Sequence, residues 1–146
     1  MASHFFSTAQ KEQILKEIKE AELDTSGEIR VHIENHCKGG NAFERGVDLL
    51  FKLKMTETAE RNAVLFYLAI KDKKFAIIGD EGINQKVPSD FWDHIKNDMA
   101  TCFKDGHFTE GLCNAIDESG RQLKAHFPYK TNDSNELSDE ISFESN

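Results

Sequence analysis

The stretch from residue 61 to residue 84 constrains the fold more than any other part of this sequence. Residues 63–70 are apolar and rich in aromatic and branched types, which is typical of a strand buried on both faces. Four polar residues follow, and a second apolar run occupies residues 75–79, so the pattern predicts an antiparallel hairpin. A strand buried on both faces needs cover on either side, which helices elsewhere in the chain must supply.

About four helices are predicted around this hairpin. Ser7 and Gln10 have the spacing of a capping box and begin the first helix, and Asn41 begins the second. Residues 87–90 open a third helix, Gly106 ends it, and a fourth helix follows from about residue 109 to residue 125. Helical spacing predicts these inward-facing residues in the second and third helices: Phe43, Val47, Leu50 and Phe51, then Phe91, Trp92, Ile95, Met99 and Phe103.

Residues 28–34 alternate between apolar and polar types and predict another strand. We expect the face with Arg30, His32 and Glu34 to be wetter, and this strand to lie nearer the sheet edge than residues 63–70. A strand, a helix and a strand in succession favour parallel pairing through a crossover. The predicted fold class is therefore α/β: a three-layer α/β/α sandwich whose small mixed sheet has one parallel crossover and one antiparallel hairpin.

The length and charge of the chain bound its organisation. A chain of 146 residues fits one domain with its own core, which we place at residues 1–130. Residues 131–146 are rich in Asn, Ser, Asp and Glu, and we expect a flexible acidic tail whose deletion leaves folding intact. The net charge of −8 disfavours nucleic acid as a partner.

The sequence has no stretch typical of a membrane span or a signal peptide. The three cysteines are an odd number at irregular spacing, which is typical of reduced thiols. We therefore expect a cytoplasmic protein that has no transmembrane segment and is a monomer.

The expected topology brings three polar segments to one edge of the sheet. Two parallel strands begin at the same edge, and the strand that returns antiparallel ends there. The segments that should converge are residues 25–28, 61–62 and 80–82.

Clustered carboxylates and neutral oxygens at this edge suit a hard divalent cation such as Ca²⁺ or Mg²⁺. We expect the ligands to be Glu28, Asp80, Glu81 and Asn84. The alternative is an ordinary solvated rim in which Arg61 pairs with one of the acids.

Four motifs occur in order along the chain: Thr-Ser-Gly-Glu-Ile-Arg-Val at 25–31, Arg-Asn-x-Val-Leu at 61–65, Gly-Asp-x-Gly-Ile at 79–83, and the run from Phe103 to Leu112. In this order they resemble the TPM domain family, named from thylakoid-lumen, photosystem II and levamisole-receptor-modulator proteins. The resemblance implies an α/β/α sandwich, divalent-metal binding in some members and a proposed acid phosphatase activity.

The sequence departs from the family pattern at the predicted edge. Many members have Asn-Asn-Gly before the central strand, where this chain has Arg61, Asn62 and Ala63. Many have Gly-x-Gly-Leu-Glu after the hairpin, where this chain has an amide, Asn84, at the Glu position. Members are often exported or tethered to a membrane.

Two functions from different classes fit these observations. The first is weak metal-assisted hydrolysis of phosphomonoesters, in which Arg61 and Asp80 would be catalytic and Ser26, Arg61 and Asn62 would contact the substrate. The second is a non-catalytic interaction module that binds a protein partner in an assembly at or near a membrane.

Overall fold

The computed structural model describes residues 4–128 and 141–144, which form one four-stranded sheet covered by helices. The strands lie in the order β3-β2-β1-β4. The elements, in chain order, are α1 (Thr8–Glu22), β1 (Glu28–Glu34), α2 (Ala42–Lys52), β2 (Ala63–Ala69), β3 (Lys74–Gly79), α3 (Glu81–Asn84), α4 (Phe91–Lys104), α5 (Phe108–His126) and β4 (Ser142–Phe143).

The first strand of the predicted hairpin, β2, is one of the two inner strands of the sheet, and its second strand, β3, lies at one edge. Strand β2 pairs antiparallel with β3, from Val64 opposite Gly79 to Ala69 opposite Lys74. It pairs parallel with β1 on its other side, beginning with Glu28 opposite Ala63. Every residue of β2 is buried, which confirms that this strand is covered on both faces.

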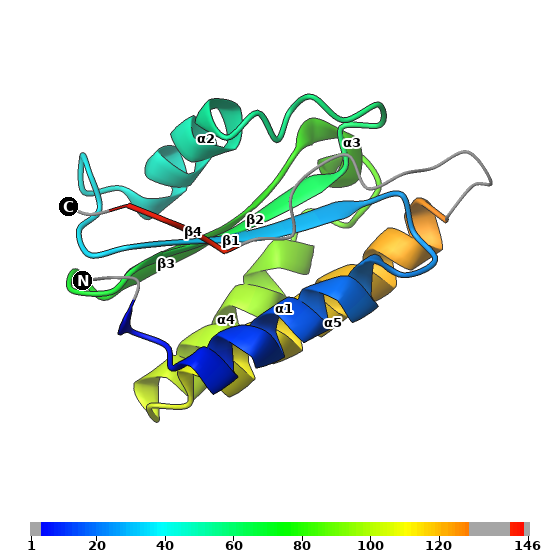
Figure 1. Cartoon of the computed structure of the whole chain (residues 1–146). Helices are drawn as coiled ribbons and strands as arrows, with labels where there is room; N and C mark the ends of the chain where they lie inside the picture. Colours follow the sequence, from blue (N-terminus) through cyan, green and yellow to red (C-terminus); the bar gives the residue numbers. More distant parts are fainter. Residues whose placement is uncertain (1–3, 129–140, 145–146) are drawn as a thin grey trace.

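The sheet separates two helical layers, as Figure 1 shows: α2 covers one face, and α1, α4 and α5 cover the other. Alternate residues of the strands supply each layer. Ile29, Val31 and Phe66 belong to the core beneath the three-helix layer, whereas Leu65 and Tyr67 belong to the core beneath α2. The three-layer α/β/α sandwich is therefore confirmed.

The helix starts follow local capping. Ser7 accepts a hydrogen bond from the Gln10 backbone N–H and completes a capping box, and Asn41 accepts one from the Glu44 N–H. The described residues contain five helices rather than about four. The additional helix, α3, is a short turn whose first amide donates to the side chain of Asp80, and its four residues are too few for a helical repeat to be recognised in the sequence.

The buried face of α2 differs from the predicted stripe. Phe43 and Phe51 are 58% and 60% exposed, so their prediction as core residues is wrong. Leu50 is buried as predicted, and the other buried residues of the helix are Arg45, Gly46 and Leu49. The physical reason is a close approach at Gly46, where an added Cβ would lie 2.1 Å from the Ile78 Cδ1 atom, so the helix can lie against β3 only with this glycine facing the sheet.

The expectation of a wet face on β1 is also wrong. His32 and Glu34 are 1% and 0% exposed, because α2 packs over this face and supplies a charged partner for the carboxylate, Arg45. On the side away from β2, the strand pairs in parallel with the short strand β4, at His32 and Ile33.

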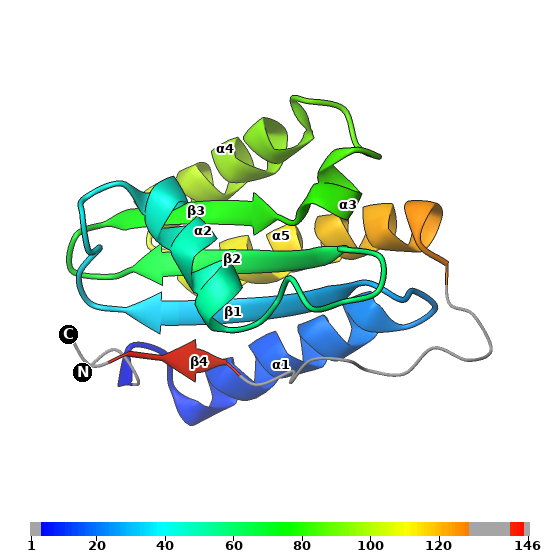
Figure 2. The same cartoon turned by 90° about the horizontal axis from the view of Figure 1, so that it is seen from above.

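The C-terminal segment differs in part from the expected flexible tail. Residues 141–144 lie along β1 and include β4 (Figure 2). They dock because Ser142 and Glu144 find polar partners on the sheet and on α2. The rest of the predicted tail, residues 131–140 and 145–146, lies outside the described residues. Among the described residues, no helix has the length and apolar composition that crossing a membrane requires.

Candidate functional site

The three segments predicted to converge do meet at the edge where β1 and β2 begin. The Asn62 side-chain amide donates to Ser26 Oγ at 3.1 Å. The Asp80 backbone N–H donates to the Ala63 carbonyl at 2.9 Å, and the Gly82 N–H donates to the Arg61 carbonyl at 2.8 Å. An added Cβ at Gly82 would lie 1.9 Å from a backbone oxygen of the preceding loop, so this close contact requires glycine. We call this region the sheet-edge site.

One half of the sheet-edge site is an ion-paired cluster centred on Arg61. Its Nε donates to Asp80 Oδ2 at 2.6 Å and its Nη2 donates to Asp80 Oδ1 at 2.7 Å, while Nη1 donates to Glu81 Oε1 at 3.1 Å. Asp80 also accepts the Glu81 backbone N–H and caps α3. Both oxygens of Asp80 therefore have donors, in the bidentate geometry typical of strong Arg–carboxylate pairs.

Asn84 is likewise held by structural hydrogen bonds. Its amide group donates to the Gly79 carbonyl at 2.8 Å, and its oxygen accepts the indole N–H of Trp92 at 2.8 Å. Two groups of described residues bring three acidic or histidine side chains close enough to share a metal ion, with ligand atoms within 4.8 Å of one another. Neither group contains Glu28, Asp80 or Glu81. The structure brings Arg61, Asp80 and Glu81 together, but it employs Asp80 and Asn84 in bonds within the protein.

The other half of the site contains Ser26, Glu60 and Asn62. Ser26 Oγ donates to Glu60 Oε2 at 2.6 Å, and the backbone N–H of Asn62 donates to the Thr58 hydroxyl. Asn62 is 1% exposed, and its Oδ1 has no hydrogen-bond donor among the described residues. Glu60 is a site residue that sequence reasoning missed, although it directly precedes Arg61.

Glu28 lies beside this second half. It is the first residue of β1, is buried, and pairs in register with Ala63, the residue that follows Asn62. Hydrogen bonds gather one carboxylate, one hydroxyl and one amide here, and the backbone register places Glu28 at the start of the adjacent strand. These are the donor types that hard divalent cations prefer.

A second polar cluster is buried between the sheet and α2. Arg45 donates from Nε to Glu34 Oε2 at 3.0 Å and from Nη2 to Glu34 Oε1 at 2.8 Å. The Tyr67 hydroxyl also donates to Glu34. Burial by itself raises the pKa of Glu34, but the hydrogen bonds from Arg45 and Tyr67 outweigh it, so the pKa is lowered and the carboxylate is charged.

His32 lies at the border of this buried cluster. Its Nδ1 is 2.7 Å from the Ser142 hydroxyl, and its Nε2 is 3.7 Å from Glu34 Oε1. Burial lowers the pKa of His32, and this outweighs the opposing effect of the Glu34 and Glu144 carboxylates. The folded chain therefore favours the neutral imidazole.

A pH dependence of stability follows from His32. The unfolded chain takes up a proton as the pH falls through about 6.5, while the folded chain resists it, so stability present above that pH is lost below it. We expect the free energy of unfolding to fall by about 1 kcal/mol between pH 7.5 and 5.5, measured by urea unfolding. His32→Leu should reduce this slope and the exposed control His94→Gln should preserve it; an unchanged slope in His32→Leu would contradict the assignment.

The fold and the sheet-edge site together define a small α/β/α domain in which three loop segments close one end of a mixed sheet. A family model described as the TPM domain matches residues 2–122, and the chain belongs to this family. No curated protein matches the chain.

Two solved structures resemble the chain. The BA42 protein of the psychrophilic bacterium Bizionia argentinensis, determined by NMR, is 41% identical and has a TM-score of 0.88, with 97% of each chain covered. The N-terminal domain of the cg2496 protein of Corynebacterium glutamicum has a TM-score of 0.66 at 12% identity, with 86% of this chain and 79% of that chain covered. The second likeness bears on the fold alone.

Proposed function

We propose that the sheet-edge site binds a divalent cation through Glu28, Glu60 and the Oδ1 atom of Asn62, and that Ser26 orients the Asn62 amide. This set keeps Glu28 from the sequence prediction and replaces Asp80, Glu81 and Asn84, which have the protein partners described above. The observation that carries the proposal is the buried Oδ1 of Asn62, which lacks a donor among the described residues. A buried polar oxygen without a partner costs free energy, and a bound cation or water would remove that cost.

The orientation of the Asn62 amide is determined by its neighbour. A serine hydroxyl has one proton, and Ser26 directs it to the carboxylate of Glu60 at 2.6 Å. Ser26 Oγ can then only accept from Asn62, so the amide nitrogen must face Ser26. Rotating the amide by half a turn would place two acceptors against each other. Oδ1 therefore points away from Ser26, where it can serve as a ligand.

Hydrolysis of phosphomonoesters is the second candidate function, and it rests on Arg61 and on the family resemblance. The Arg61 side chain is 34% exposed, and its contact with Glu81 is made at the solvent-exposed surface. Surface ion pairs of this kind contribute little, so a phosphate oxygen could replace Glu81 while Asp80 holds the guanidinium in place. A divalent cation bound nearby would supply Lewis-acid activation of the phosphoryl group.

Metal titration tests the cation site directly. We expect Ca²⁺ or Mg²⁺ to bind to the purified chain, with backbone NMR shifts at residues 26–28 and 60–63. Glu60→Gln should weaken binding by about tenfold, because one charged ligand is lost. Glu57→Gln is the matched control, since it makes the same change at an exposed residue of the same loop and should leave the affinity unchanged.

The competing ligand sets give different results in the same titration. Loss of binding in Asp80→Asn with wild-type affinity in Glu60→Gln would support the ligands predicted from sequence instead. No shifts at millimolar metal would overturn the cation site and favour the non-catalytic interaction module. Adding a generic phosphomonoester tests hydrolysis separately: activity that is lost in Arg61→Gln supports it, and activity that survives in both Arg61→Gln and Glu60→Gln comes from elsewhere.

A further inference from the structure

A second binding surface lies at the opposite end of β1 from the sheet-edge site. Residues 141–144 of the same chain lie against it in an extended conformation, with β4 pairing with His32 and Ile33 and the Glu144 N–H donating to the Ile33 carbonyl at 3.2 Å. Among the described residues, the first part of β1, from Glu28 to Val31, has no ladder partner on this side. The Ile29 N–H donates to the Glu22 carboxylate at 2.8 Å, and the Val31 carbonyl accepts from the Ser142 hydroxyl at 3.5 Å. The backbone that pairs with an extended peptide is therefore the stretch of β1 at His32 and Ile33.

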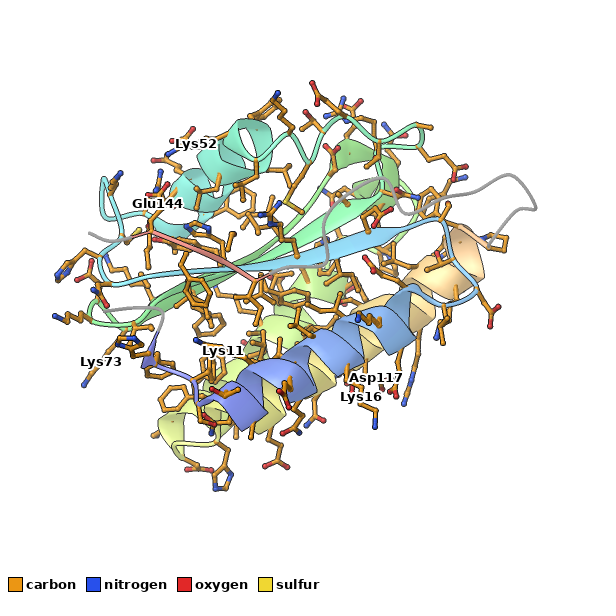
Figure 3. The ribbon with its side chains drawn as sticks, viewed as in Figure 1. Lys11, Lys16, Lys52, Lys73, Asp117 and Glu144 are labelled. Atoms are coloured by element: carbon orange, nitrogen blue, oxygen red, sulfur yellow. The ribbon has the colours of Figure 1, made fainter. Side chains whose placement is uncertain are left out.

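The carboxylate of Glu144 enters a cluster of three basic side chains, which we call the basic cradle. Arg45 and Lys52 donate to its two oxygens at 2.8 Å each, and Lys38 donates at 3.4 Å. Figure 3 shows Lys52 reaching from α2 towards Glu144 at the end of β4. The hydrogen bond from Lys52, with the nearby charges of Arg45 and Lys38, lowers the pKa of Glu144 to about 2. The cradle therefore binds a charged carboxylate.

The basic cradle carries more positive charge than the fold itself requires. Arg45 already has a bidentate partner in Glu34. Lys38 and Lys52 are 57% and 60% exposed and would be hydrated without Glu144. Removing Glu144 leaves three cations opposite one buried carboxylate, which is an attractive surface for an acidic segment.

A metal ion is a poor occupant of this place. Ligand atoms of His32, Glu34 and Glu144 do lie within 4.8 Å of one another. However, the guanidinium of Arg45 donates to both of these carboxylates, so a cation would have to share them with an existing positive charge. The geometry selects an anionic group on an extended backbone.

The segment that occupies the surface is held by a short ladder, by polar contacts and by the packing of Ile141 and Phe143 against the core. The ladder extends over two residue pairs, Ser142 meets His32, and the Phe143 ring lies 5.3 Å from the Lys11 ammonium. All four residues of the segment are only partly buried. An element with so little burial belongs to the low-stability part of a fold, which opens locally without global unfolding.

We propose that the end of β1 and the basic cradle form a docking site for an extended acidic peptide with a Glu two residues after a Ser, and that residues 141–144 occupy it as an exchangeable ligand. The Ser would meet His32, the next residue would lie beside Lys11, and the Glu would enter the cradle. A partner strand of this pattern binds by displacing the segment of the chain itself. The segment belongs to the same chain, so it competes with a separate peptide as an intramolecular ligand at an effective concentration on the order of millimolar.

Peptide binding to the full chain tests this proposal. The probe is a fluorescent synthetic peptide with the sequence of residues 139–146, and the readout is its anisotropy. We expect the Glu144→Gln chain to bind the probe about tenfold more tightly than the wild-type chain does, because its own segment competes less. Ser142→Ala should have the same direction of effect and serves as a second variant.

Two controls separate recognition from general attraction between charges. Adding Lys52→Gln to the Glu144→Gln chain should weaken probe binding about tenfold, whereas adding Lys16→Gln should not, because Lys16 is an exposed lysine on the opposite helical layer (Figure 3). A probe with Gln in place of its Glu at position 144 should bind weakly. Two results would overturn the proposal. One is equal binding of a scrambled probe, and the other is no binding of the probe to either the Glu144→Gln or the Ser142→Ala chain at millimolar peptide.

Discussion

Replacing Arg45 with methionine is expected to lower the free energy of unfolding by about 3–5 kcal/mol. The change leaves the Glu34 carboxylate, which is 0% exposed, without the guanidinium that donates to both of its oxygens. A buried charge that loses its partner is costly because a carboxylate at this depth has little access to water. The loss of the contact with Glu144 adds to the effect.

Urea unfolding measures this loss, and a double variant identifies its cause. Glu34→Gln in the Arg45→Met background removes the unpaired charge while keeping an acceptor for Tyr67, so it should recover part of the stability. Arg121→Met is the matched control, since its ion pair with Asp117 is solvent-exposed, and it should change stability by less than about 0.5 kcal/mol. A loss below about 1 kcal/mol in Arg45→Met would show that Glu34 is accessible to solvent in solution.

Truncating Leu68 to alanine is expected to cost about 2–5 kcal/mol. Leu68 lies on β2 opposite Phe75 and belongs to the core shared with the three-helix layer. The change removes buried apolar surface and leaves a cavity, which the paired strands on either side of β2 cannot readily close. The same substitution at Leu23, which is 62% exposed, should cost less than about 0.5 kcal/mol.

Denaturant unfolding of Leu68→Ala and of the wild-type chain measures this loss, and the m-values of the two chains should be equal. An m-value equal to that of the wild-type chain would show that the variant unfolds from the same compact state. A loss of less than about 1 kcal/mol under these conditions would mean that β2 is not the centre of the core.

The features that the sequence alone predicted are those with a strong local pattern. The apolar run at residues 63–70 predicted a strand buried on both faces and its hairpin, and every residue of β2 is buried. The caps at Ser7 and Asn41 predicted where α1 and α2 begin. The order of strands and helices also predicted which loops converge, because parallel and antiparallel pairing determine where each strand ends. Arg61 was foreseen as a competitor for the acids of the sheet edge, and it does pair with Asp80.

Features that depend on partners distant in the sequence were decided only by the tertiary structure. Alternation on β1 indicated a wet face, but the ion pair with Arg45 of α2 compensates the cost of burying the Glu34 carboxylate. Gly46 selected the face of α2 through its approach to Ile78, and no helical period could reveal that contact. The acidic character of residues 131–146 predicted a flexible tail, and nothing in the sequence indicated that Glu144 meets three cations from two other segments. The sequence does not show whether a polar side chain is solvated by water or paired with a charged residue distant in the chain. The folded structure decides between these two cases.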